Sequence, residues 1–385
     1  MLILVINCGS SSMKYDLFDV KKESSLCKGI VERIGETSSF LKHEVSGKAP
    51  FEKEVSCGNH HQATEIVKDI LTSSSEGVLS DVSEVAGVGH RVVHGGEEFH
   101  SATLIDDKVL ASVEKFSELA PLHNPPALEG IRSCMKIFAS TPQVAVFDTA
   151  FHHAMPQQAY CYGIPYEFYK KYGIRRYGFH GTSHRYVSIK AAELLGRPLK
   201  ELKLITAHLG NGCSIAAVSG GKSIDTSMGF TPLEGLLMGT RCGDIDPAVV
   251  FFLMEKENLI AGEISDMLNK KSGLLGVSGI SNDMRDILES IEEGNSRAKL
   301  AYDIFVYRIK KYIGAYAAVL ESVDAVVFTA GIGEHVPQIR DDVKKNLKTI
   351  LGNKTEFLTI HTDEELLIAK DTHRIIAGEN AGSKS

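Results

Sequence analysis

The chain has 385 residues, more than one hydrophobic core usually supports, so two domains are expected. Its 42 Lys and Arg residues are outnumbered by 49 Asp and Glu residues, which gives a net charge of -7 and disfavours binding to nucleic acid or to an acidic membrane. The seven scattered cysteines include no CxxC pair, and no stretch reaches the ~18 apolar residues of a spanning helix, so a cytoplasmic protein is expected.

The N-terminal residues predict a strand, a polar turn and a second strand. Residues 3–6 (ILVI) are β-rich, residues 7–12 (NCGSSS) are polar, and residues 15–18 (YDLF) resume the strand pattern. The same order recurs where residues 202–205 lead into the glycine turn at 208–212. The sequence therefore predicts an internally duplicated α/β protein with two lobes.

Two further apolar runs predict strands that end in polar residues. Residues 144–147 lead into Asp148, and residues 325–328 lead into the glycine turn at 331–333. Open α/β sheets bind ligands at the carboxyl ends of their strands, so these ends are candidate ligand sites.

Helices are predicted after several of these turns. Asn124 is expected to cap one helix, with Pro125 in its first turn and His123 just before it. Either Thr182 or Ser183 is expected to cap a second helix, which leaves His180 in the turn ahead of it. That helix should run to Leu195 and close at Gly196. A long amphipathic helix is predicted over 297–320, with Leu300 on its buried side.

The glycine turns are candidates for phosphate binding. Glycine lets backbone N–H groups approach phosphate oxygens closely, although a single turn such as 210–212 is more often an ordinary hairpin. Two such turns opening equivalent halves, with a third at 331–333, favour phosphate binding. Lys14 could then reach a phosphate, or it could be a solvated surface lysine. Gly221-Lys222-Ser223 is a chance match to a Walker A loop, because no helix pattern follows it.

Cationic and histidine residues lie among these motifs. Arg91 and Arg241 stand among glycines, where they could bind an anion or pair with Asp106, Asp244 or Asp246. A transition-metal site is disfavoured, because no ligand pair has HExxH-like spacing. The histidines weighed for such a site are His123, His180, His184 and His208.

Many of these segments, in chain order, resemble those of the acetate kinase family. The segments that carry the resemblance are 7–12, 89–96, 121–126, 147–152, 177–184, 208–212, 226–235, Arg241 and 331–334. The resemblance implies an α/β fold of two duplicated ribonuclease H-like domains with an interdomain cleft, as in the actin-like ATPases. The implied N-terminal lobe comprises 1–148 plus 365–385, and the implied nucleotide-binding lobe comprises 149–364.

The resemblance also implies a reaction and a set of site residues. The γ-phosphoryl group of ATP would pass reversibly to acetate, giving acetyl phosphate and ADP, with Mg²⁺ or possibly Mn²⁺ as the metal and a homodimer as the assembly. The implied catalytic residues are Arg91, His123, Asp148, His180 and Arg241. With Arg91, the implied acetate pocket contains Val93, Leu122, Phe179 and Pro232, and the implied metal ligands are Asn7, Asp148 and Glu364, with Glu365 left open. The implied nucleotide contacts, to which we add Lys14, are His208, Leu209, Gly210, Asn211, Gly212, Asp283, Met284, Arg285, Gly331, Ile332, Gly333, Glu334 and His335.

One departure from the family pattern concerns the nucleotide site. The family commonly has Asn where this chain has His335, which leaves the nucleotide preference open.

The chemistry explains why such a site needs cations. Acetate is already an anion at pH 7, so it needs no general base. The barrier is repulsion from the triphosphate, which costs about 4 kcal/mol for each like-charge pair at ~4 Å and an effective dielectric near 20. We assign Arg91 and Arg241 to this task and expect direct in-line transfer, with a phosphohistidine intermediate as the alternative. Rival functions are a propionate or butyrate kinase and, in a different class, a nucleotide-dependent switch protein on the same fold.

Overall fold

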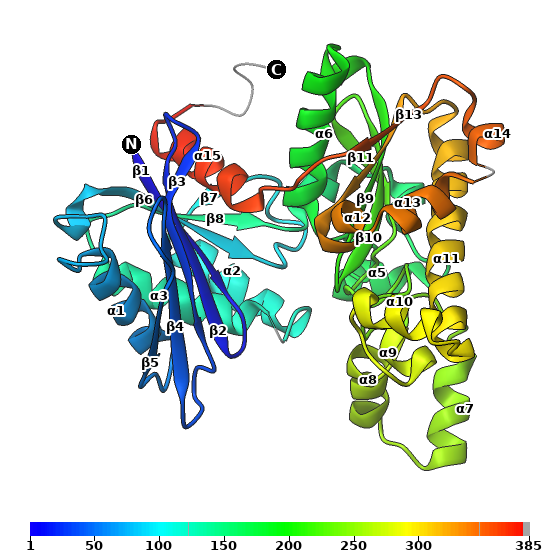
Figure 1. The fold of residues 1–385 in the computed structure, drawn as a ribbon, viewed down its shortest axis with the longest axis horizontal. Helices are drawn as coiled ribbons and strands as arrows, with labels where there is room; N and C mark the ends of the chain where they lie inside the picture. Colours follow the sequence, from blue (N-terminus) through cyan, green and yellow to red (C-terminus); the bar gives the residue numbers. More distant parts are fainter. Residues whose placement is uncertain (122, 346, 380–385) are drawn as a thin grey trace. The chain divides into compact units, whose positions relative to one another are not determined.

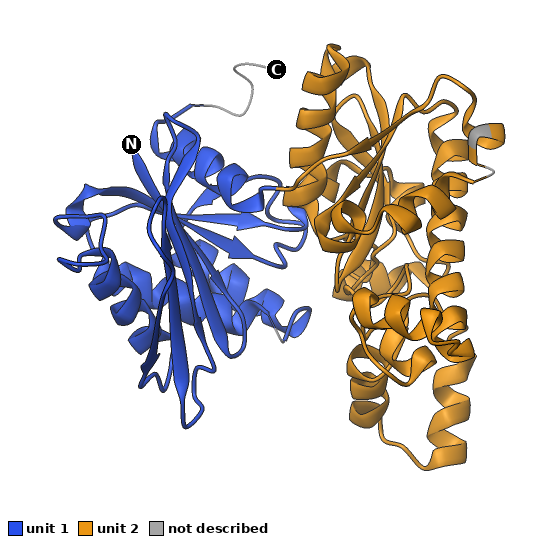
Figure 2. Ribbon diagram, in the orientation of Figure 1, with its two compact units in different colours: residues 1–150, 363–385 blue, residues 151–362 orange. Residues whose placement is uncertain are grey.

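The computed structural model describes residues 1–121, 123–345 and 347–379. The chain divides into two compact units (Figure 2). Unit 1 consists of Met1–Ala150 and Asp363–Ser385, and unit 2 consists of Phe151–Thr362. Glu364, at the end of the expected second lobe, therefore falls in the same unit as Asp148.

Unit 1 is built on an eight-stranded sheet with the order β5-β4-β3-β2-β1-β6-β8-β7 (Figure 1). Its strands are β1 (Leu2–Cys8), β2 (Ser12–Asp19), β3 (Ser24–Glu32), β4 (Ser39–Val45), β5 (Phe51–Val55), β6 (Val85–Val92), β7 (Thr103–Leu104) and β8 (Gln143–Phe147). Its helices are α1 (His60–Leu71), α2 (Asp107–Lys115), α3 (Asn124–Ile137) and α15 (Glu364–Ile376). Alternation along β2 sends Met13, Tyr15 and Leu17 into the core beneath α1 and α3, and Asp16 to the opposite face.

Unit 2 is built on a five-stranded sheet with the order β11-β10-β9-β12-β13. Its strands are β9 (Lys203–Leu209), β10 (Cys213–Ser219), β11 (Lys222–Thr226), β12 (Ala325–Thr329) and β13 (Glu356–Thr359). The stretch β3-β2-β1-β6-β8 of the first sheet and the whole second sheet, β11-β10-β9-β12-β13, share one pattern, in which three antiparallel strands are followed by two parallel ones. The first sheet adds the antiparallel strands β4 and β5 at one edge and β7 at the other. This shared order confirms the predicted duplication and the α/β fold class.

The helices of unit 2 lie on both sides of this sheet and, with α7 and α8, extend beyond its end (Figure 1). They are α4 (Gln157–Tyr160), α5 (Tyr166–Tyr172), α6 (Gly181–Leu195), α7 (Ala248–Glu257), α8 (Ala261–Lys270), α9 (Gly273–Ser278), α10 (Met284–Glu292), α11 (Ser296–Leu320), α12 (Ala330–His335), α13 (Pro337–Lys344) and α14 (Leu347–Leu351). Val187 and Ala191 of α6 pack against Leu204 of β9 and Val218 of β10. Within the described residues, no helix combines the length and the apolar composition needed to cross a bilayer.

Three details of the predicted helices are wrong. Asn124 is the first residue of α3 and His123 occupies the cap position, because the Asn124 side chain bonds instead to the backbone of His94. His180, rather than Thr182 or Ser183, is the cap residue of α6, with a left-handed φ of 57°. Leu300 is 52% exposed rather than buried. The predicted end of α6 at Gly196 is confirmed.

Candidate active site

The first glycine turn joins β1 to β2 in unit 1. Gly9 N donates to Ser12 O at 2.8 Å, which closes the turn. Asn7 and Lys14 are paired across the two strands, directly beside it. Lys14 is exposed, and its charge acts to lower the pKa of Glu364. The turn thus places an amide and a lysine side chain near the carboxylates described next.

Arg91 joins two carboxylates in unit 1. Its Nε donates to Asp148 Oδ1 at 3.0 Å and its Nη2 donates to Asp148 Oδ2 at 2.8 Å, a two-bond fork. The same Nη2 lies 3.9 Å from Glu364 Oε2. Burial raises the pKa of Glu364 to about 7, and the nearby Asp148 raises it further while Arg91 opposes the shift. Arg91 therefore does not pair with Asp106, which instead caps α2 through Val109 N.

The start of α3 is fastened to the segment that follows β6. Asn124 Oδ1 accepts from His94 N at 3.1 Å, and Asn124 Nδ2 donates to His94 O at 3.0 Å. These two bonds bring exposed His123, at the cap position of α3, into the neighbourhood of half-buried Val93. Leu122, which the sequence analysis placed in the acetate pocket, lies outside the described residues.

A histidine cluster lies at the start of α6 in unit 2. The rings of His180 and His208 stack with centroids 4.2 Å apart. Ser214 Oγ lies 2.9 Å from His180 Nδ1 and 2.7 Å from His184 Nε2, so one hydroxyl holds both rings. Burial lowers the pKa of His184 well below its ordinary value, with further contributions from its histidine neighbours. His184 therefore remains neutral in this cluster.

Arg241 lies beside the second glycine turn. A Cβ built on Gly212 would fall 2.8 Å from Arg241 Nη2 and 3.3 Å from His180 Cε1, so a side chain at position 212 would displace the Arg241 guanidinium. Arg241 Nη1 donates to Pro232 O at 2.8 Å. In the described part of the chain no carboxylate is paired with Arg241, and burial lowers the pKa of its guanidinium. Asp244 instead accepts from the Tyr312 hydroxyl and lies 3.6 Å from Arg308, and the described residues show no ion pair between Arg241 and either Asp244 or Asp246.

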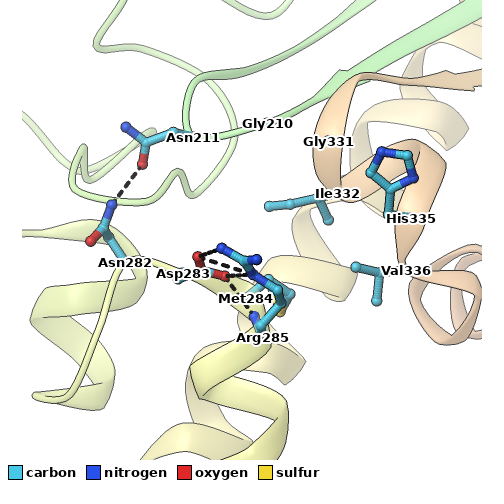
Figure 3. Close-up of a pocket in the computed structure, with 10 residues that line it drawn as sticks. All are labelled: Gly210, Asn211, Asn282, Asp283, Met284, Arg285, Gly331, Ile332, His335 and Val336. Atoms are coloured by element: carbon cyan, nitrogen blue, oxygen red, sulfur yellow. Dashed lines mark hydrogen bonds and ion pairs between the residues drawn. The ribbon is translucent and has the colours of Figure 1, made fainter. Parts of the chain in front are cut away.

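A pocket of about 470 Å³ opens in unit 2 (Figure 3). It is lined by Gly210, Asn211, Asn282, Asp283, Met284, Arg285, Gly331, Ile332, His335 and Val336. Figure 3 shows the side chain of Arg285 turned toward Asp283, to which its Nη2 donates at 2.6 Å. That pairing lowers the pKa of Asp283 to about 2. The volume falls within the 300–1,000 Å³ typical of small-molecule sites.

This pocket brings together eight of the residues expected to bind nucleotide, from three distant stretches of chain. His208, Leu209, Gly212 and Gly333 do not line it. Glu334 also lies outside the lining, because its Oε1 accepts from Ala330 N at 2.8 Å and its Oε2 bonds to His361. Sequence reasoning missed Asn282 and Val336. Their position directly beside Asp283 and His335 was the available signal.

Phe179, which is expected in the acetate pocket, lies in the interior of unit 2. It is 2% exposed, and its carbonyl lies 2.9 Å from His152 Nε2. It directly precedes His180, so the histidine cluster fixes its backbone.

The duplicated α/β fold, with Arg241 beside a glycine turn, fits the class of α/β phosphotransferases, to which the family match below assigns the chain. The chain belongs to the Acetokinase family, whose model matches residues 2–381. It is 55% identical to the acetate kinase of Halothermothrix orenii over 98% of this chain and 100% of that protein. It is 53% identical to the acetate kinase of Thermoanaerobacter pseudethanolicus over the same shares.

Solved structures give the same relationship. The crystal structure of Porphyromonas gingivalis acetate kinase has a TM-score of 0.93 and 45% sequence identity, covering 97% of this chain and 99% of that chain. The crystal structure of a propionate kinase from Francisella tularensis has a TM-score of 0.91 and 42% sequence identity, covering 97% of this chain and 99% of that chain.

Proposed function

We propose that this protein is an acetate kinase that transfers the γ-phosphoryl group of ATP reversibly to acetate, giving acetyl phosphate and ADP. The observation that carries the proposal is the half-buried guanidinium of Arg241, which faces the Gly212 turn and has no carboxylate partner in the described part of the chain. A partly desolvated cation without a counterion favours binding of an anion. Because the chain belongs to the Acetokinase family, we assign that anion to the transferred phosphoryl group.

In this proposal the arginines act mainly on the transition state. Phosphoryl transfer spreads negative charge over the equatorial oxygens, and donors fixed beforehand stabilise that charge without reorganising. Arg241 is held by the Pro232 carbonyl and Arg91 by Asp148, so neither guanidinium must be ordered during the reaction. His180 is held in the same way by Ser214, and we assign it to the same oxygens. His123 lies at the N-terminus of α3, where the partial positive charge of the helix dipole favours a nearby anion.

We further propose that the pocket of Figure 3 holds the adenosine part of ATP and that the turn at 208–212 holds its phosphates. The pocket is large enough for a nucleoside, and its glycines leave room for a flat ring. Gly210 N is bonded to Gly212 O at 3.1 Å, which fixes the turn at the edge of the pocket. Lys14 would contribute a further cation.

We propose Mg²⁺, with Mn²⁺ as a possible substitute, as the metal that accompanies ATP, and Asn7, Asp148 and Glu364 as the residues that hold it. Among the described residues no cluster of three or more His, Cys, Asp or Glu side chains is arranged for a metal. Mg²⁺ bound to a nucleotide commonly takes one or two carboxylates, with water and phosphate completing its shell. Glu364 Oε2, which is buried and has no hydrogen-bond partner in the described structure, fits such a cation. The ion would neutralise phosphate charge.

Direct in-line transfer is preferred to a phosphohistidine intermediate. The acceptor is already ionised, and no nucleophile stronger than the carboxylate is needed. Transfer with ATP made chiral at the γ-phosphorus distinguishes the two routes. Inversion of configuration supports the direct route, and retention supports the covalent one.

The second candidate is a propionate kinase, which the likeness to the Francisella tularensis protein favours over other acids. We assign Val93, Leu122, Phe179 and Pro232 to the pocket for the methyl group. One extra methylene in such a pocket changes specificity by only ~1–3 kcal/mol, so the two activities can overlap.

A panel of acids from formate to butyrate, with Mg-ATP and trapping of the acyl phosphate as hydroxamate, tests the function. We expect the highest kcat/KM with acetate. Higher kcat/KM with propionate would make it a propionate kinase, and ATP hydrolysis that no acid stimulates would favour a switch protein.

We also propose that the protein is a homodimer and that it lies in the cytoplasm. Analytical sedimentation tests the first statement, and cell fractionation tests the second.

A further inference from the structure

An irregular and largely buried segment, residues 226–235, leaves the end of β11 in unit 2. Backbone polar groups buried in such a segment need hydrogen-bond partners, because a regular ladder does not supply them. Arg176 supplies several. Its Nη1 donates to three consecutive carbonyl oxygens, those of Thr226 at 2.9 Å, Ser227 at 3.2 Å and Met228 at 3.2 Å.

The same guanidinium also holds the far end of the segment. Arg176 Nη2 donates to Glu234 Oε1 at 2.5 Å, with side chains only 17% and 31% exposed. The Tyr162 hydroxyl donates to the other oxygen of Glu234 and accepts from Phe230 N at 2.8 Å. A Cβ on Gly229 would lie 1.7 Å from Glu234 Oε2, so the carboxylate packs directly on the backbone. Arg176 thus ties the beginning of the segment to its end.

A second anchor fixes the residues that follow. Asp244 Oδ1 accepts from Gly235 N at 2.9 Å, and Asp244 Oδ2 accepts from the Tyr312 hydroxyl at 2.9 Å. Asp244 N also donates to Gly235 O at 2.9 Å. The chain between Gly235 and Asp244, which includes Arg241, is therefore closed into a loop.

Within the part of the segment that Arg176 holds, one carbonyl group faces Arg241. Pro232 O accepts from Arg241 Nη1 at 2.8 Å, and Arg241 Nη2 is directed to the Gly212 turn. The described residues offer Arg241 no carboxylate that could orient it. The direction of its guanidinium therefore depends on where Pro232 O lies, and Arg176 and Glu234 fix that position.

We propose that Arg176, with Glu234 as its partner, is a positioning residue for phosphoryl transfer, acting through Pro232 O on the orientation of Arg241. This inference rests on the proposed function. Lysine cannot replace Arg176, because an ammonium lacks the planar fork that reaches three carbonyls and a carboxylate together. A misplacement of about 1 Å at a reacting group can cost 10²-fold in rate, so a small shift of Pro232 is sufficient.

Arg176→Lys tests the proposal, and Arg197→Lys is its matched control. Arg197 pairs with Asp324 at 2.6 Å near the end of α6, and both side chains are partly exposed. We expect kcat for acetyl phosphate formation to fall roughly 10- to 100-fold in Arg176→Lys, with the KM for ATP little changed. Arg197→Lys should keep the wild-type kcat. Glu234→Gln weakens the ion pair between Arg176 and Glu234, and it serves as the second variant if Arg176→Lys does not fold.

A double-mutant cycle separates positioning from general stability. In an Arg241→Ala background, Arg176→Lys should cause almost no further loss of kcat, since residues that act as a unit are not additive. A merely structural Arg176 would lower the melting temperature and leave the kcat of folded protein unchanged. That result, or full additivity with Arg241→Ala, would overturn the proposal. A wild-type enzyme that forms no acyl phosphate would instead refute the proposed function.

Discussion

Arg91 and Asp148 form a two-bond fork in unit 1, and Glu364 lies 3.9 Å from the same guanidinium. The pairing raises the pKa of Arg91, because the Asp148 charge more than offsets the effect of burial. Burial raises the pKa of Glu364 to about 7, so its ionised form is disfavoured without a further cation. A divalent metal beside Glu364 would favour the ionised carboxylate.

Replacing Asp148 by Asn tests the metal assignment. The amide keeps the shape but removes the charge, so we expect a higher Mg²⁺ concentration for half-maximal activity and a loss of roughly 10²-fold in kcat. Titration of activity with Mg²⁺ at saturating ATP measures both. Asp324→Asn, at the exposed pair with Arg197, is the control and should match the wild type. An unchanged Mg²⁺ requirement in Asp148→Asn would contradict the assignment.

Gly331→Leu tests the nucleotide pocket. No atom lies within 4 Å of a Cβ built on Gly331, so the fold should accept the side chain while the pocket loses space. We expect the KM for ATP to rise at least ~10-fold, a loss of ~1.4 kcal/mol, with the KM for acetate nearly unchanged. Gly314→Leu in α11 is the control. A Cβ at Gly314 is equally free of contacts, and Gly314 is not among the residues that line the pocket. Equal KM values for ATP in both variants would refute the pocket as the nucleotide site.

Val93→Ala tests the acid pocket. Removing two methyl groups should make room for a longer acid, so the ratio of kcat/KM for propionate to that for acetate should rise by roughly 10-fold or more. The hydroxamate assay with both acids measures the ratio. Should both acids lose activity equally, Val93 does not contact the acyl chain.

Asp16 gives a pH prediction. Burial raises its pKa to about 7; Glu365 and Asp363 raise it further, while a hydrogen bond from Ser25 and the charge of Lys28 oppose the shift. Because the folded state holds this proton more tightly than the unfolded chain, the free energy of unfolding falls as pH rises from about 4 to about 7.

Asp16→Asn removes this group. The slope of the free energy of unfolding against pH should then become less negative by up to about 1.4 kcal/mol per pH unit in that window. Urea unfolding from pH 4.5 to 8 measures it, with Asp19→Asn, whose pKa is lowered rather than raised, as the control. An unchanged slope in Asp16→Asn would show that this carboxyl titrates normally.

The strands were predictable because short apolar runs bounded by polar turns have few alternatives. The helix starts were not, since tertiary contacts decided them. Asn124 has the residue type of a cap, yet its amide bonds to His94, 30 residues earlier. His180 takes a left-handed conformation, which is uncommon for non-glycine residues and which its sequence neighbours do not signal.

The candidate site divides in the same way. The glycine turns and the arginines among them are local patterns, so the sequence revealed them. The Arg176–Glu234 pair joins residues 58 positions apart and leaves no local pattern. Asn282 and Val336 were missed because their types are ordinary and only the folded chain brings them to one pocket.

The kcat of Arg241→Ala is the most direct test of the central claim that a fixed, half-buried cation stabilises the phosphoryl group during transfer. With Mg-ATP and acetate both saturating, we predict a kcat lower by roughly 10²-fold or more, the scale of losing one electrostatic donor. The affinity for ADP should stay close to that of the wild type. A near-native kcat in a folded Arg241→Ala protein would contradict the account.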